Sequence, residues 1–306
     1  MLHPAVRVSD DAVLIVAGAT CSGKTALAVD LAEQYDAEII GADSRQVYRG
    51  MPIGTAAPAA EQLARVPHHL VAMLDPHERY SAARFSDDAL AAIRAIRGRG
   101  KRALVVGGTG FYLRALAGDV VLSPAYDAEV RARLAREARL HPPEVMHAWL
   151  AARDPGRAAE LAVGDRYRVT RALEIALSAG SPDEPAQERQ TLRSQGYRVV
   201  KIVLDVPQAV IDERIAARVE GMLEAGLLAE AERIGPDAVA ADAVGYPQAL
   251  AYLAGLSTDA ELRTTLARAT RRYALRQRTW FRTEPGTQVV APADVAQAVR
   301  SELGWT

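Results

Sequence analysis

The chain has 306 residues, of which 49% are hydrophobic and 25% are charged, so it is long enough for one large domain or for a domain with a smaller insertion. Its net charge of −1 excludes a strongly basic protein, and overall charge therefore does not mark it as a nucleic-acid-binding protein. No apolar run approaches the roughly 20 residues of a membrane-spanning helix, there is no secretory signal, and Cys21 is the single cysteine, so we expect a cytoplasmic protein without membrane association.

The first predicted element is a buried strand at about Ala12–Ala17, and after a short turn a helix runs to about Tyr35. The turn has the pattern G-x-x-x-x-G-K-[ST] and consists of Gly18, Ala19, Thr20, Cys21, Ser22, Gly23, Lys24 and Thr25, here called the phosphate loop. In such a loop backbone N–H groups and the helix N-terminus surround a phosphate, Lys24 adds positive charge, and the Thr25 hydroxyl is placed to ligate Mg²⁺. A chance glycine turn is the alternative, but the flanking strand and helix favour a site for a polyphosphate or pyrophosphate group.

A second strand is predicted at Ala37–Ala42, and Asp43 follows it directly. In a parallel sheet this position lies at the carboxyl edge beside the phosphate loop, where a carboxylate can ligate Mg²⁺ or accept a proton. A purely structural role in a turn is the alternative for Asp43. The next three side chains, Ser44, Arg45 and Gln46, could read the edge of a base. Residues 49–80 are rich in Pro and Gly, and we expect them to be mostly irregular.

A helix at Phe85–Arg97 and a strand at Lys101–Val106 continue the alternation, which predicts a parallel, doubly wound α/β sheet. The strand ends at Gly107-Gly108-Thr109, where small residues allow close backbone approach and Thr109 offers a hydroxyl. An ordinary ATPase would be expected to carry a magnesium-binding Asp at the end of this strand. Its absence argues against routine ATP hydrolysis.

Helical patterns without strands then follow at 127–140, 144–152 and 166–179, and a polar segment at 181–195 predicts a linker. Strand character returns at Val199–Leu204, and two further helices are expected at about 208–233 and 261–281. We therefore expect an α/β core formed by 1–122 and 197–306, interrupted by a small all-helical insertion domain at 123–196.

Three basic groups lie on predicted helices. Arg214 and Arg218 share one helical face and could converge on a phosphate, or could instead pair with neighbouring acids. Arg268, Arg272 and Arg276 form a stripe on the late helix, which is equally typical of an RNA contact or of a solvated face. In the insertion, Arg166, Arg168 and Arg171 form a basic cluster with Tyr167 between them. This cluster and the stripe on the late helix are basic elements in two different domains, which favours an RNA ligand held between the domains. His68-His69 lacks the spacing of a metal site.

Together these segments resemble the bacterial tRNA dimethylallyltransferases, also called tRNA isopentenyltransferases. The resemblance extends in order from about Val13 to Arg282, and besides the phosphate loop it includes Asp43–Ala56, Pro67–Leu70, Tyr80–Phe85, Val106–Tyr112, Gly221–Glu230, Val244–Tyr246 and Arg276–Arg282. The phosphate loop is generic, whereas Asp43–Ala56 and the Arg-Gln-x-x-Trp pattern ending at Trp280 are highly specific. Pro247, where a charged residue is usual, is among the few departures, and these affect RNA docking more than the chemistry.

The resemblance implies a P-loop NTPase-like α/β fold and a prenyltransferase that moves the dimethylallyl group of dimethylallyl diphosphate to N6 of the adenosine at tRNA position 37. It implies that Asp43 is the base and that Thr109, the second catalytic residue, hydrogen-bonds near the reacting amine or the diphosphate. It also implies that the phosphate loop with Arg218 and Mg²⁺ at Thr25 holds the diphosphate. The implied tRNA contacts are Asp43, Ser44, Arg45, Gln46, Thr109, Arg131, Tyr167, Arg168, Val169, Thr170, Arg171, Arg276 and Gln277. We expect the enzyme to act as a monomer.

Three other classes of protein share some of these features. An adenylate isopentenyltransferase would need neither the helical insertion nor its basic cluster. A nucleotide or small-molecule kinase would need a metal-binding acid where Gly107 and Gly108 stand. A non-catalytic RNA-binding protein gives no reason for Lys24, Thr25 and Asp43 to meet at one sheet edge. The transferase interpretation is therefore favoured.

Overall fold

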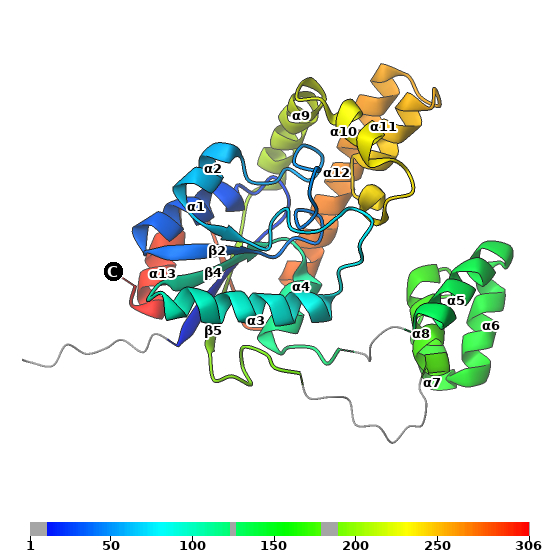
Figure 1. Cartoon of the computed structure of the whole chain (residues 1–306), viewed down its shortest axis with the longest axis horizontal. Coiled ribbons are helices and arrows are strands. Elements are labelled where there is room, and N and C mark those ends of the chain that lie inside the picture. Colours follow the sequence, from blue (N-terminus) through cyan, green and yellow to red (C-terminus); the bar gives the residue numbers. More distant parts are fainter. Residues whose placement is uncertain (1–10, 123–126, 179–188, 306) are drawn as a thin grey trace, which may run out of the picture. The chain divides into compact units, whose positions relative to one another are not determined.

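A computed structural model of the chain describes residues 11–122, 127–178 and 189–305 (Figure 1). Its centre is a six-stranded sheet in the order β3-β2-β4-β1-β5-β6, and all neighbouring strands are parallel. The strands are β1 (Ala12–Ala17), β2 (Ala37–Gly41), β3 (His68–His69), β4 (Arg102–Gly107), β5 (Arg198–Leu204) and β6 (Thr287–Val290). The predicted parallel α/β sheet is confirmed.

Helices cover the sheet on both sides, and Figure 1 shows the sheet between α1 and α3. Those of the sheet layer are α1 (Lys24–Gln34), α2 (Ala60–Arg65), α3 (Ala82–Gly98), α4 (Gly110–Ala117) and α13 (Val295–Leu303). Every residue of β1 is buried, which explains its unbroken apolar sequence. Leu14 of β1, Val29 of α1 and Val299 of α13 share one hydrophobic core.

A second hydrophobic core lies among the helices after β5. They are α9 (Gln208–Glu224), α10 (Leu227–Ile234), α11 (Tyr246–Leu253) and α12 (Asp259–Arg282), with short 3₁₀ turns at Val239–Asp242 and Pro292–Asp294. Val219, Leu227, Tyr246 and Leu266 are buried in this core. Met51 also belongs to it, so the segment after β2 packs onto these helices.

The chain divides into two compact units, Met1–Val120 with Gln190–Thr306 and, separately, Val121–Arg189. The second unit contains the helices α5 (Ala128–Leu140), α6 (Pro143–Arg153), α7 (Pro155–Ala159) and α8 (Arg166–Ser178). Leu134, Met146, Leu150 and Leu173 form its own core. An all-helical unit thus interrupts the α/β core.

The bounds of the two units differ from the expected 123–196 at the C-terminal end, because Gln190–Gly196 belong to the first unit. Leu192 is fully buried, and its backbone N–H donates to the Leu116 carbonyl at 2.8 Å. Arg193 also pairs with Asp119 at 3.0 Å. These contacts hold the returning chain against α4 before β5 begins. Most of the predicted linker at 181–195 lies outside the described residues.

One other local prediction was wrong. The helix expected at 208–233 is divided into α9 and α10 at Gly226, whose φ of 98° is left-handed and ends the regular helix. Residues 49–80 are mostly irregular, as predicted, and they also contain the short helix α2 and the edge strand β3. Within the described residues, none of the helices combines the length and the apolar character needed to cross a membrane.

Candidate active site

The phosphate loop joins β1 to α1 at the carboxyl edge of the sheet. Gly23 precedes α1 with a φ of 87°, and Cys21 also has a positive φ of 63°. The Ser22 backbone N–H donates to the Ala19 carbonyl at 3.2 Å, which closes the turn. Since α1 begins at Lys24, its free N–H groups face the loop, as a phosphate site requires.

Lys24 is the cationic side chain of the loop. Its ammonium group donates to the Ala19 carbonyl at 3.3 Å. Burial lowers the pKa of Lys24, and the negative charge of Asp43 partly opposes this shift. A diphosphate bound in the loop would restore the preference for the charged amine, so the loop is electrostatically suited to an anion.

Two arginines of α9 reach the phosphate loop. The Arg218 guanidinium donates to the Thr20 hydroxyl at 2.7 Å, and the Arg214 guanidinium donates to the Cys21 carbonyl at 3.2 Å. The acids that could have neutralised them are paired elsewhere, Asp212 with Arg271 and Glu220 with Arg263. Both α9 arginines therefore converge on the loop rather than on their helical neighbours.

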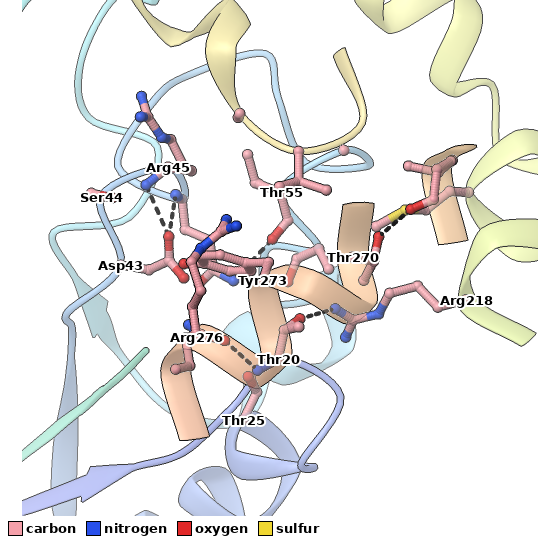
Figure 2. Close-up of a pocket in the computed structure, with 18 of the residues that line it drawn as sticks. Thr20, Thr25, Asp43, Ser44, Arg45, Thr55, Arg218, Thr270, Tyr273 and Arg276 are labelled. Carbon is pink, nitrogen blue, oxygen red and sulfur yellow. Dashed lines mark hydrogen bonds between the residues drawn. The ribbon is translucent and has the colours of Figure 1, made fainter. Parts of the chain in front are cut away.

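Asp43 begins a tight turn after β2. One carboxylate oxygen, Oδ1, accepts hydrogen bonds from the backbone N–H groups of Arg45 at 2.9 Å and Gln46 at 3.3 Å. The other oxygen, Oδ2, has no hydrogen bond to any described residue, and Asp43 lines the same pocket as Lys24 and Thr25 (Figure 2). The turn role and a chemical role are thus compatible, because each uses a different oxygen.

Thr109 lies against this turn from the next strand of the sheet. Its hydroxyl accepts a hydrogen bond from the Ser44 backbone N–H at 3.0 Å, and its own N–H donates to the Ala42 carbonyl at 3.2 Å. Gly107 permits the close approach, because a Cβ there would lie only 2.0 Å from the Ala42 carbonyl oxygen. The structure therefore brings Asp43 and Thr109 together, as the sequence predicted.

Gln277 of α12 connects the two halves of the site. Its side-chain oxygen accepts a hydrogen bond from the Thr20 N–H at 2.7 Å, and its amide nitrogen donates to the Gly108 carbonyl at 2.9 Å. A Cβ on Gly108 would lie 2.3 Å from that nitrogen, so the glycine makes room for the amide. Gln277 is buried and both ends of its amide are used inside the protein, so it connects parts of the site, and its tRNA contact stays a prediction.

Two more of the predicted tRNA contacts are also held by the protein. The Arg45 guanidinium pairs with Asp242 at 2.8 Å, and the Gln46 amide donates to the carbonyls of Thr55 and Ala56 at 3.2 and 2.9 Å. These bonds fix the shape of the turn that presents Ser44 and Asp43. Arg276 is exposed and lines the pocket, whereas Arg268 and Arg272 are exposed and lie outside its lining.

One pocket is lined by Lys24, Asp43, Arg218 and Gln277, whereas Thr109 and Arg214 lie outside its lining. Figure 2 shows side chains from the phosphate loop, from the Asp43 turn, from α9 and from α12 around the pocket. Met222, Leu266, Thr270 and Tyr273 also line it, and the sequence analysis missed them. Leu266, Thr270 and Tyr273 lie with Gln277 on one face of α12, so helical spacing from Gln277 could have found these three, whereas no local pattern marks Met222 on α9. Burial and the nearby charge of Asp43 raise the pKa of Tyr273, which stays a neutral phenol.

The remaining predicted contacts lie in the second unit. On α8, Tyr167 and Arg168 are exposed, Thr170 is half-buried, Val169 is fully buried, and Arg171 pairs with Glu174 at 3.0 Å. Arg166 donates to the carbonyls of Ala138 and His141 at the end of α5, so it holds that helix end. Arg131 on α5 is half-buried. Tyr167 and Arg168 are therefore the predicted contacts best placed to meet a ligand.

The fold has a parallel α/β core with a phosphate loop that two arginines of α9 reach, and a carboxylate lies in the same pocket as the loop. These features define a phosphate-loop protein with room for a second substrate. The family model described as IPP transferase matches residues 46–284, and the one described as isopentenyl transferase matches residues 11–73. The chain therefore belongs to the IPP transferase family.

Individual relatives agree with this assignment. The chain is 42% identical over 282 residues to the tRNA dimethylallyltransferase of Geobacter sulfurreducens, covering 90% of this chain and 91% of that one. It is 45% identical over 283 residues to the tRNA dimethylallyltransferase of Anaeromyxobacter dehalogenans, covering 91% and 94%.

Solved structures are also similar. The tRNA isopentenylpyrophosphate transferase of Bacillus halodurans is 35% identical with a TM-score of 0.70, covering 96% of this chain and 97% of that one. A eukaryotic dimethylallyltransferase acting on tRNA is 25% identical with a TM-score of 0.73, covering 95% of this chain and 76% of the other.

Proposed function

We propose that this chain transfers the dimethylallyl group of dimethylallyl diphosphate to N6 of the adenosine at tRNA position 37, releasing diphosphate and forming N6-isopentenyladenosine. The observation that carries the proposal is that the phosphate loop and the Asp43 turn line one pocket. A prenyl donor and a nucleophile that must lose a proton need such a pair of sites. The names of the relatives and of the solved structures support the same activity.

The donor half of the reaction falls to the phosphate loop. Backbone N–H groups, Lys24 and Arg218 hold the diphosphate and stabilise the negative charge that it gains when the C1–O bond breaks. Thr25 would hold Mg²⁺, an ion that commonly uses one or two protein oxygens together with phosphate oxygens and water. The Thr25 hydroxyl lines the same pocket as Lys24 and, together with phosphate oxygens of the donor, fits that donor set. When bound, Mg²⁺ offsets the charge of the diphosphate.

Asp43 serves the acceptor half of the reaction, in which the adenine amine is the nucleophile. The exocyclic amine of adenine is a poor nucleophile because its lone pair is delocalised into the ring, so a base must take a proton as the new C–N bond forms. N6 attacks C1, the electron pair of the C1–O bond leaves with the diphosphate, and a proton of N6 passes to Asp43. Oδ2 is the oxygen available for this step, since Oδ1 holds the turn. We assign the Thr109 hydroxyl, which accepts the Ser44 N–H at the Asp43 turn, to a hydrogen bond near the reacting amine or the diphosphate.

The target base has to leave the stack of the anticodon loop to reach this pocket, at a cost of about a few kcal/mol. We assign contacts with the RNA to Ser44, Arg45 and Arg276 at the pocket, and to Tyr167, Arg168 and Arg131 on the helical unit. Exposed aromatic and arginine side chains are suited to stack on bases and pair with phosphates. We further propose that the enzyme works as a monomer in the cytoplasm, where its tRNA substrate is found.

Incubation with unmodified tRNA carrying adenosine at position 37, dimethylallyl diphosphate and Mg²⁺, followed by nucleoside mass analysis, tests the proposal. We expect a mass gain of one dimethylallyl group on that adenosine, with AMP and ATP present as competing acceptors. Modification of AMP alone would indicate a free-nucleotide prenyltransferase, and ATP consumption without transfer would indicate a kinase. Either outcome would overturn the proposal.

A further inference from the structure

The pocket has an end that neither the diphosphate site nor the Asp43 turn accounts for. We call it the apolar end, and Met222 and Leu266 are the apolar side chains of the pocket lining that define it. In Figure 2, Arg218 and Thr270 lie on the side of the pocket away from Asp43. Met222 follows Arg218 by one helical turn, and Leu266 precedes Thr270 by one turn, so the helices place both apolar side chains on that side.

Helix α9 sets the distance between the phosphate loop and the apolar end. Arg214, Arg218 and Met222 follow one another at intervals of four residues, so they share a face at steps of about 6 Å along the helix. The first two bind the phosphate loop and the third does not. One turn beyond the last phosphate-loop arginine, the helix therefore presents an apolar side chain to the pocket.

The hydrophobic core of the helices after β5 lies behind the apolar end. Leu266 is only 1% exposed and belongs to the same core as Val219, Leu227 and Tyr246. Met222 packs against that core as well. Adding methylene groups to a well-packed protein interior forces unfavourable side-chain and backbone conformations, so the depth of the apolar end is fixed.

Polar side chains beside the apolar end are already engaged within the protein. The Thr270 hydroxyl donates to the Leu266 carbonyl at 2.9 Å, and the Thr55 hydroxyl donates to the Met51 carbonyl at 2.6 Å. Asp242, which also lines the pocket, pairs with Arg45 at 2.8 Å. An incoming group therefore meets packing surface at this end rather than hydrogen-bonding partners, which suits a hydrocarbon.

We propose that Met222 and Leu266 form a wall that limits the transferred group to a single isoprene unit. With the diphosphate in the phosphate loop, a five-carbon tail follows the α9 face past Arg218 and ends against Met222, whereas a ten-carbon geranyl tail collides with the wall. This inference rests on the proposed function and adds the residues that select the length of the donor.

Transfer to one tRNA from dimethylallyl diphosphate and from geranyl diphosphate, compared as the ratio of kcat/KM values, tests the wall. We expect Met222→Ala to lower the preference for dimethylallyl diphosphate at least about tenfold, since even one methylene commonly changes specificity by that much. Leu223→Ala is the matched control, because Leu223 is the next residue on α9, packs on the same core and does not line the pocket. We expect it to keep the wild-type ratio.

A second variant separates the tail from the diphosphate. Met222→Phe shortens the apolar end, so we expect it to raise the KM of dimethylallyl diphosphate while leaving inhibition by inorganic diphosphate unchanged. Weakened inhibition by inorganic diphosphate would mean that the variant disturbs the phosphate loop and would contradict the proposal.

Several results would overturn the inference. One is a wild-type enzyme that uses both donors equally well. Another is an equal change of the ratio in Met222→Ala and Leu223→Ala. An unchanged ratio with a raised KM for tRNA would mean that the apolar end receives the adenosine instead. A wild-type enzyme that transfers neither prenyl group would refute the proposed function itself, and the wall with it.

Discussion

The two sides of the pocket are built in different ways. The donor side is one continuous segment, Gly18–Thr25, to which α9 adds two arginines. The acceptor side is assembled from segments far apart in the chain, the Asp43 turn, Thr109 and α12, and hydrogen bonds of specific geometry connect them. Under the proposed function, most of the diphosphate site comes from one local motif, whereas the placement of the base and the nucleophile requires the whole fold.

This difference predicts that changes on the acceptor side affect the chemical step and changes on the donor side affect binding. The largest effect is expected for Asp43→Asn. The amide oxygen still accepts the N–H groups of Arg45 and Gln46, so the turn is kept while the base is lost. We expect kcat to fall by about 10²–10⁴-fold with little change in the KM of dimethylallyl diphosphate. Steady-state transfer assays measure both, and wild-type kcat would exclude Asp43 as the base.

Gln277→Met tests the two hydrogen bonds by which Gln277 connects the donor side of the pocket to the acceptor side. Methionine fills similar space but leaves the Thr20 N–H and the Gly108 carbonyl without their partner. We expect a loss of about 2–5 kcal/mol of unfolding free energy in denaturant titrations, and a change in both kcat and KM. Gln277→Glu keeps the acceptor for Thr20 but sets a buried carboxylate oxygen against the Gly108 carbonyl, so we expect it to be destabilised as well. If the two sides were independent, only one of the two kinetic constants would respond to the methionine.

Arg218→Ala tests the donor side alone. Loss of a charged hydrogen-bond donor at the phosphate loop should raise the KM of dimethylallyl diphosphate by about 10- to 100-fold. Arg214→Ala is the matched comparison one turn away, and because it binds a backbone carbonyl rather than a side chain of the loop, we expect a smaller rise. Equal effects of the two substitutions would contradict the separate assignment of Arg218.

Tyr246→Phe is expected to have the smallest effect. The Tyr246 hydroxyl donates to the buried carboxylate of Glu230 at 2.8 Å, and that carboxylate accepts the N–H groups of Ile53 and Gly54. Removal of one bond from this group should cost about 1 kcal/mol in thermal or denaturant unfolding, with activity largely kept. A large loss of activity would show that the segment at Gly54 takes part in the reaction.

The sequence predicted those parts of the molecule that depend on local pattern. The apolar run of β1 and the glycine spacing after it place the phosphate loop correctly, and the residue after β2 places Asp43 at the same sheet edge as Thr109. The role of Gln277 could not be read in this way, because its partners Thr20 and Gly108 are 257 and 169 residues away in the chain. Only the packing of α12 brings them together.

The helices after β5 show the same limit. Gly226 ends α9 by its left-handed backbone, which helical periodicity alone does not reveal. Met222 reads as an ordinary core residue of that helix, and its place in the pocket follows only from the way α9 packs beside the phosphate loop. The apolar wall is therefore a property of tertiary structure.

The central claim is that one pocket joins the diphosphate to the adenosine through Asp43. A structure of the protein bound to an anticodon stem-loop and an unreactive analogue of dimethylallyl diphosphate tests it most directly. We expect the diphosphate in the Gly18–Thr25 loop and the adenine N6 within hydrogen-bonding distance of the Asp43 carboxylate. An adenine bound away from Asp43, or a diphosphate outside the phosphate loop, would contradict it.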